Sequence, residues 1–388
     1  NYEFTYVNGV LKIFGHPTNI ILTQGILFEN RPGGTAAGTL ASESPDPNAT
    51  YTYSLVSGTG STDNALFAIS GNNIVTAATL NFEQKSVYSV LVRSTTQYGF
   101  FLDKALTITI SDVNEVPTLD VVANQVLCYS PGAKTISLSG ITGGPETSQT
   151  ATMTVTSSNL NLITQLAVTG TGTTRTIGYL PADSNGGTTT LTVTVRDNGG
   201  TANGGTDTFV RTFTVTINPL PVITLSSSQG TVISKGVSTQ LTAFGGQTYT
   251  WANSAGIVSG QNTNVLTVRP AVSTTYTVTV TSAAGCVSTQ SINLQVMEDY
   301  KALDGANILT PNGDGRNDFL VIKNIDFYPN NILKIFDTAG RLLHEKKGYA
   351  NDWGGTYQGL PLAEGTYFYI LDFGNRSNTQ RGFVSIVY

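Results

Sequence analysis

Apolar residues alternate with Thr or Ser along much of this chain. The alternation is clearest in three stretches with nearly the same text, ALTITIS at 105–111, RTFTVTI at 211–217 and QSINLQV at 290–296. Residues two apart lie on the same face of a strand, so each stretch would turn one face to a core and the other to water. The pattern therefore predicts an all-β chain.

Proline-containing joints follow the first two of these strands, at 114–117 and 218–221. Proline has no N–H for a β-ladder, so each strand should end there. The strands recur roughly 80 to 105 residues apart, which is the size of an immunoglobulin-like sandwich. We expect tandem β-sandwich modules with these boundaries: 18–117, 118–219, 220–297 and 298–388.

Residues 1–17 are predicted to be the end of a preceding β repeat. Asn8-Gly9 lies between two short apolar stretches, as in a hairpin turn. Half of a hairpin pair cannot bury its own apolar face, so we expect the polypeptide to begin upstream, inside another domain. Residues 1–14 resemble the end of an MBG-type repeat.

Composition and charge exclude several classes of function. Only 12% of residues are charged, the net charge is −5 and there is no basic block, so we expect no nucleic-acid partner. The chain has two histidines and none of the common hydrolase, metalloprotease or nucleotide-binding motifs, which argues against an enzyme. Its two cysteines, Cys128 and Cys286, are far apart in sequence, and we expect two buried thiols without a disulfide or a metal.

The first module carries four ordered motifs: FENRPGGT at 28–35, YTYSLVSG at 51–58, LNFE at 80–83 and DVNEVP at 112–117. In this order they resemble bacterial cadherin-like repeats. The resemblance implies a calcium site at the joint between modules, because carboxylates from end loops and an acidic linker can surround this oxygen-seeking cation. The residues at matching positions are Glu29, Asp46, Glu83, Asp112 and Asn114, with Glu115 beside them.

This module departs from the family pattern where Ser44, Asn81 and Thr96 replace expected carboxylates. The alternative is that the polar residues are ordinary linker and turn residues. The second module, which resembles an Ig-like module of Bacteroidetes surface proteins, offers a similar choice. Its Glu146, Asp197 and Asp207 fit either an end-of-sandwich cation site or, as we favour, a long Gly/Asn/Asp turn.

The third module resembles an Ig-like domain and has only two charged residues, Lys235 and Arg269. Trp251 and Tyr276 fall where such a domain has its core Trp and its tyrosine corner. An exposed Trp251 stacking on a sugar is the less favoured alternative.

The composition changes near Met297, since residues 298–388 hold 20 of the chain's 45 charged residues. Their text includes TPNGDG at 310–315, NDWGGT at 351–356, EGTYFY at 364–369 and a strand-like C-terminal stretch. This resembles the gliding-motility-associated C-terminal domain, the type B sorting signal of the Bacteroidetes type IX secretion system. The motif residues are Thr310, Pro311, Asn312, Gly313, Asp314, Gly315, Trp353, Glu364, Gly365 and Tyr367.

We expect this domain to be a small β-sandwich of seven or so strands. Its loop residues Asn312, Asp314, Asn317 and Asp318 fit a short calcium loop or, equally, a hydrogen-bonded Asx turn. The resemblance implies export by the type IX translocon and retention by a PorP/SprF-type outer-membrane barrel. Such a domain can be gripped by strand addition or by pocket insertion.

Together these features predict the stalk and sorting region of a cell-surface adhesin of the gliding-motility type. It would be extracellular, attached to the outer membrane of a Gram-negative bacterium, with an unknown surface ligand bound by upstream domains. The alternative is the spacer and sorting region of a secreted polysaccharide-degrading enzyme whose catalytic domain lies upstream.

Overall fold

The structure is a computed structural model that describes residues 15–298, 305–374 and 378–388. Its described elements are β-strands and three one-turn 3-10 helices, η1 (Asn64–Leu66), η2 (Ala202–Gly204) and η4 (Ile325–Phe327). Across this described part, no helix has the length and apolar character needed to cross a membrane. The all-β prediction is confirmed, whereas the hairpin expected at residues 1–14 lies outside the described residues.

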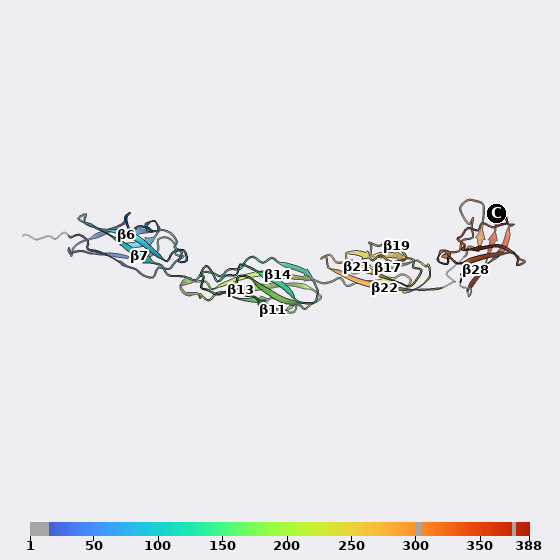
Figure 1. The fold of residues 1–388 in the computed structure, drawn as a ribbon, viewed down its shortest axis with the longest axis horizontal. Helices are drawn as coiled ribbons and strands as arrows, with labels where there is room; N and C mark the ends of the chain where they lie inside the picture. The colour runs from blue at the N-terminus through green and yellow to red at the C-terminus, as the bar shows by residue number, and fades with distance from the viewer. Residues whose placement is uncertain (1–14, 299–304, 375–377) are drawn as a thin grey trace, which may run out of the picture. The chain divides into compact units, whose positions relative to one another are not determined.

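The first sandwich has a four-stranded sheet in the order β1-β2-β5-β4 and a three-stranded sheet in the order β3-β6-β7. Its strands are β1 (Asn19–Thr23), β2 (Ala36–Glu43), β3 (Tyr51–Leu55), β4 (Phe67–Ser70), β5 (Asn73–Thr76), β6 (Val87–Thr96) and β7 (Phe101–Thr109). The long strands β6 and β7 lie side by side (Figure 1). Inward residues of both sheets, such as Ile74, Val90 and Ile108, are fully buried in one core.

The second sandwich pairs the sheet β10-β13-β14-β8 with the sheet β11-β12-β9. Its strands are β8 (Gln125–Cys128), β9 (Lys134–Leu138), β10 (Thr152–Ser157), β11 (Ile163–Thr169), β12 (Arg175–Pro181), β13 (Gly187–Arg196) and β14 (Thr208–Asn218). The predicted alternation holds in β13, where Leu191, Val193 and Val195 are completely buried between outward Thr residues.

The third sandwich consists of the sheets β15-β17-β20-β19 and β16-β22-β21-β18. Its strands are β15 (Thr224–Ser227), β16 (Val232–Ser234), β17 (Thr239–Phe244), β18 (Thr248–Trp251), β19 (Ile257–Ser259), β20 (Val265–Val268), β21 (Thr274–Thr281) and β22 (Val287–Met297). Trp251 and Tyr276 are buried in its core, as predicted. The Tyr276 hydroxyl donates to the Ala255 carbonyl, 21 residues upstream, rather than to the nearby backbone as in a tyrosine corner.

The C-terminal domain has a five-stranded sheet, β23-β29-β28-β24-β25, and a two-stranded sheet, β26-β27. Its strands are β23 (Ile308–Leu309), β24 (Ile332–Phe336), β25 (Leu342–Lys347), β26 (Thr356–Tyr357), β27 (Leu360–Pro361), β28 (Gly365–Asp372) and β29 (Thr379–Ile386). One core joins the inner face of the larger sheet to the connecting segments, with Tyr349 and Trp353 buried in it.

The chain divides into two compact units, and the four predicted domain boundaries stay predictions. One unit runs to Gln125 and includes Pro131–Asp183 and Thr188–Thr216. The other unit comprises Val126–Ser130, Ser184–Gly187 and Ile217–Tyr388.

The prediction of two unpaired thiols is wrong, because Cys128 and Cys286 form a disulfide within the second unit. Their Cα atoms are 5.5 Å apart, which suits a disulfide. Cys128 ends β8 beside Asn218, the last residue of β14, whose carbonyl accepts the Tyr129 N–H at 2.8 Å. The chain leaves β14 for the third sandwich there, so a cysteine distant in sequence lies next to Cys286.

Candidate functional site

Four carboxylates converge where the first sandwich ends. Glu29, Glu83, Asp112 and Glu115 each place an oxygen within 4.8 Å of the other three. Calcium ligands lie about 2.3–2.6 Å from the ion, so oxygens up to roughly 5 Å apart can share one cation. Among the described residues, this is the acidic cluster whose spacing fits a bound metal.

Backbone pairing brings these residues together from distant parts of the sequence. A parallel bridge between Phe28 and Ser111 places Glu29 beside Asp112, and the Glu29 N–H donates to the Ser111 carbonyl at 3.1 Å. The Asn30 N–H donates to the Leu80 carbonyl at 3.0 Å, which brings in the segment that carries Glu83. The FENRPGGT, LNFE and DVNEVP motifs thus build one end of the sandwich.

Glu29 is the fixed centre of the cluster and is only 1% exposed. Its carboxylate accepts the Phe82 N–H at 2.7 Å and the Val113 N–H at 2.9 Å. A buried carboxylate needs such partners, because losing hydration costs free energy that hydrogen bonds offset. The two N–H donors hold Glu29 in place for the other three carboxylates.

The crowded carboxylates have perturbed pKa values. Burial raises the pKa of Asp112, and the neighbouring carboxylates Glu29 and Glu146 raise it further. Burial and a hydrogen bond with Glu146 raise the pKa of Glu115 to about 7, with the charges of Glu29 and Glu83 adding to the effect. Negative charges packed this closely favour a proton or a cation between them.

Glu146 comes from the second sandwich and extends the acidic cluster. Its Oε1 accepts the Glu115 N–H at 2.9 Å, while its Oε2 and the Oε2 of Glu115 are buried without a hydrogen-bond partner among the described residues. Buried carboxylate oxygens are normally paired, so two unpaired ones beside a carboxylate cluster fit a bound cation. The sequence placed Glu146 in a separate site, because it gave no sign that this loop meets the first sandwich.

Asn114 points away from the carboxylates and into the loops of the second sandwich. Its Nδ2 donates to Asp197 Oδ1 at 3.1 Å and to the Gly200 and Thr206 carbonyls, and its Oδ1 accepts from Gln149. The structure therefore gives Asn114 a bridging place between loops, outside the group of four carboxylates.

The two aspartates of the long second-sandwich loop take different places. Asp207 pairs with Arg196, with Nη2 at 2.8 Å, and hydrogen bonds from Thr208 and Arg196 lower its pKa. Asp197 accepts the Gly199 N–H, as an Asx turn requires, but its Oδ2 is buried without a partner in the described part of the chain. The turn interpretation thus fits Asp207 better than Asp197.

The structure does not bring Asp46 to the cluster. Strand β6 begins near the acidic end at Val87 and finishes at Thr96, which pairs with Tyr51 a few residues after Asp46. Ten residues of strand span about 30 Å, so Asp46 lies at the opposite end of the sandwich. There its Oδ1 accepts the Asn48 N–H at 2.9 Å and closes a turn.

The acidic loop of the C-terminal domain is organised by its own backbone. Asp318 accepts the N–H groups of Gly313 and Gly315, both at 2.7 Å, and Asp314 accepts the Arg316 N–H at 2.7 Å. Asn312 accepts the Asp314 N–H, whereas Asn317 uses its backbone carbonyl to accept the Thr310 N–H. These hydrogen bonds favour the Asx-turn alternative.

The remaining motif residues hold the C-terminal domain together. Trp353 is buried and its Nε1 donates to the Thr356 carbonyl at 3.1 Å. The Tyr367 hydroxyl donates to the Ala363 carbonyl, and Glu364 accepts the Tyr388 N–H at 2.8 Å. Gly365 begins β28, while Thr310 and Pro311 connect β23 to the acidic loop.

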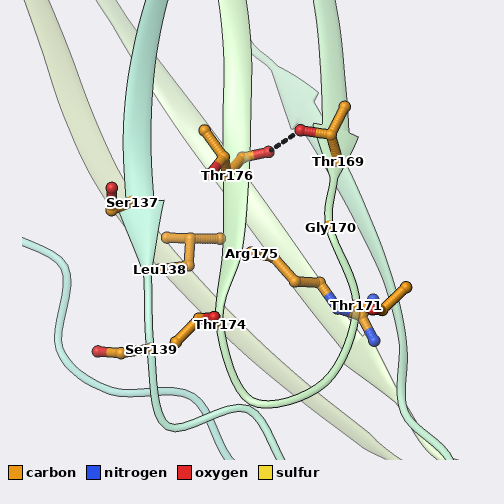
Figure 2. Close-up of a pocket in the computed structure, with 9 residues that line it drawn as sticks. All are labelled: Ser137, Leu138, Ser139, Thr169, Gly170, Thr171, Thr174, Arg175 and Thr176. Carbon is orange, nitrogen blue, oxygen red and sulfur yellow. Dashed lines mark hydrogen bonds between the residues drawn. The ribbon is translucent and has the colours of Figure 1, made fainter.

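A shallow hollow on the second sandwich is the other notable concave feature. Figure 2 shows Arg175 among Ser and Thr side chains of β9, β11 and β12, with the Thr169 hydroxyl bonded to the Thr176 carbonyl. The hollow has a volume of about 540 Å³, and its nine lining residues include no Asp, Glu, His or Cys. It therefore offers no pair of groups for acid–base catalysis.

Comparison with known proteins identifies the C-terminal part. Residues 303–386 match the CHU_C type IX secretion signal domain. The chain thus carries a signal for the type IX secretion machinery, which implies interaction with that machinery and export to the cell surface or beyond. No curated protein matched this chain.

Structural comparison finds cadherin ectodomains. The human desmocollin-1 ectodomain matches at 14% identity and a TM-score of 0.33, over 96% of this chain and 79% of that one. A protocadherin γB7 EC3–6 structure matches at 15% and 0.38, over 95% and 100% of the chains. Mouse cadherin-23 EC22–24 matches at 15% and 0.37, over 70% and 95%.

Proposed function

We propose that this chain is the non-catalytic stalk and sorting region of a cell-surface adhesin of the gliding-motility type. The observation that carries the proposal is the type IX signal domain at 303–386, preceded by tandem β-sandwiches that lack an evident catalytic constellation in their described residues. Low charge and Thr-rich strands suit spacers, which need stable, soluble modules more than reactive groups.

We further propose that calcium binds between the first and second sandwiches. Glu29, Glu83, Asp112 and Glu115 supply oxygens at a suitable spacing, and Glu146 adds one from the second sandwich. Asn114 supports the site by holding the adjoining loops, and Asp46 has no part in it. The unpaired oxygens and the raised pKa values support this assignment, because a divalent cation would neutralise the crowded charges.

The proposed destination is the outer membrane, where a PorP/SprF-type barrel would retain the exported chain. The alternative is a secreted polysaccharide-degrading enzyme with its catalytic domain upstream. The two differ in the fate of the chain after export, because an anchored stalk stays with the cell whereas a released enzyme reaches the medium.

The test is to express residues 1–388 behind a secretory leader in a type IX-competent host, beside a version that ends at residue 297. Protease shaving and fractionation would measure how much of each chain reaches the surface, the medium and the periplasm. We expect the complete chain on the surface, the shortened one in the periplasm, and recovery of a barrel protein with the complete chain from detergent-solubilised outer membranes. Release of the complete chain into the medium without a barrel would favour the enzyme alternative.

A further inference from the structure

An apolar row crosses the outward face of the five-stranded sheet in the C-terminal domain. Strand register places Leu342 opposite Phe336, Phe336 opposite Phe368, and Phe368 opposite Phe383. Four neighbouring strands, β25, β24, β28 and β29, each contribute one side chain. Strands lie about 4.8 Å apart, so the row extends about 14 Å.

The row faces away from the core. Phe368 is 47% exposed and Phe383 is 46% exposed, while their chain neighbours Tyr367 and Val384 are buried on the inner face. Ile308, 54% exposed, extends the apolar surface, because it pairs with Ser385 on the same face. Single exposed apolar residues are ordinary, but a contiguous group of them marks an interaction surface.

The sheet edges are poorly suited to adding another strand. The edge strand β25 carries His344, Glu345, Lys346 and Lys347, and charged residues discourage pairing along an edge. The opposite edge, β23, is only two residues long. Contact through the apolar face is therefore favoured over strand addition.

The charges beside the row leave a net positive face. Lys334 pairs with Glu345, at 3.6 Å, in the rank of residues next to the row. Arg381 lies in the same rank on β29, and Lys347 and Asp372 lie in the following one. Lys334, Lys347 and Arg381 outweigh Glu345 and Asp372 by one positive charge, so a carboxylate-bearing partner is complementary to this face.

We propose that this row docks on a folded protein of the type IX export and anchoring machinery, whose contact surface is apolar and flanked by carboxylates. The proposal rests on the proposed function and specifies which surface of the sorting domain performs it. A second copy of the chain is a poorer occupant, because two net positive faces would repel each other.

The test uses the full chain with Phe368 and Phe383 both changed to Thr, in the type IX-competent host described above. Threonine keeps strand propensity while removing the aromatic surface. The matched control is Leu360→Thr, because Leu360 is 71% exposed but lies on β27, outside the large sheet. Arg381→Glu and Glu345→Lys change the charge beside the row in opposite directions.

We expect the Phe368→Thr/Phe383→Thr chain to melt within a few degrees of the wild type, yet to be retained on the surface at least tenfold less. Leu360→Thr should match the wild type, Arg381→Glu should reduce retention, and Glu345→Lys should not. Normal retention of the folded double variant would overturn this proposal alone. Failure of the wild type to be exported would overturn the proposed function and this inference with it. A wild-type dimer that the double variant dissolves, measured by sedimentation, would replace the machinery with a second copy as the occupant.

Discussion

Single carboxylates decide how the joint between the first two sandwiches responds to calcium. We expect calcium to raise the melting temperature of the full chain, and EGTA to reverse the increase. Calcium at about 100 times its dissociation constant would contribute about 2.7 kcal/mol. Asp112→Asn should remove most of this response, because it takes one charged ligand from the group of four. Calorimetry with added calcium or EGTA measures the effect.

Asp46→Asn is the matched control, because Asp46 caps a turn at the far end of the same sandwich. That variant should keep the full calcium response even if its own stability changes. Glu115→Gln sharpens the test: without calcium it should stabilise the chain, since it relieves the repulsion that raises the pKa of Glu115 to about 7. Equal responses of wild type and Asp112→Asn would refute a calcium site in this cluster.

His344 should make the C-terminal domain sensitive to mild acid. Burial lowers its pKa, with the charge of Lys346 acting in the same direction and that of Asp352 opposing it. The unfolded chain therefore takes up a proton near pH 6.5, whereas the folded domain does so at a lower pH. Stability should consequently fall as the pH drops below about 6.5, and level off once the folded domain is also protonated.

Urea unfolding at a series of pH values measures this, with fluorescence of Trp353, whose ring centroid lies 5.9 Å from that of His344, as a signal. His344→Phe should flatten the dependence between pH 5 and 7, because it removes the titrating group. An unchanged slope in that variant would assign the effect to other groups.

At the scale of elements, the disulfide ties β8 to the turn before β22. Reduction should lower the stability of the second unit, by about 4–5 kcal/mol in the chain-entropy model for a loop of this size. Cys128→Ser, Cys286→Ser and the double variant should be equally destabilised, because each breaks the same bond. Rapid labelling of both thiols in the native, unreduced chain would contradict the disulfide.

The sequence predicted the elements better than the contacts between them. Strict alternation, as in β13, predicted the strands and the core, because a side-chain period of two has one buried solution. The motifs also placed Glu29, Glu83 and Asp112 in one site. The joint contacts of Glu146, the pairing of Cys128 with Cys286 and the register that aligns Phe336, Phe368 and Phe383 all depend on which loops and strands meet. Spacing along the chain carries little information about such meetings.

At the scale of the whole molecule, each joint between neighbouring sandwiches uses a different chemistry. Carboxylates gather after the first sandwich, and a disulfide follows the second. The third sandwich has only two charged residues, and both contact the C-terminal domain or the segment leading to it. Lys235 pairs with Glu298 at 2.9 Å and lies 4.6 Å from the ring centroid of Tyr328. Its scarce charges therefore serve the joint.

Arg269 is the stronger of these two contacts. Its Nε donates to the Gly236 carbonyl at 2.8 Å within the third sandwich, while its Nη groups reach Asn324 at 2.6 Å and Asp326 at 3.1 Å. Its guanidinium also lies 4.4 Å from the centroid of the Phe327 ring. A planar cation with five donors can make all these contacts at once, which a lysine at this position could not.

Arg269→Met should therefore uncouple the third sandwich from the C-terminal domain while leaving both folded. We expect their unfolding to separate into two calorimetric transitions, with a loss of about 1–2 kcal/mol from the ion pair and the cation–π contact together. Arg341→Met is the control, because Arg341 pairs with Asp337 inside the C-terminal domain, at 3.1 Å. If Arg269→Met and Arg341→Met unfold alike, Arg269 does not couple the two domains, and the third sandwich would act only as a spacer before the sorting signal.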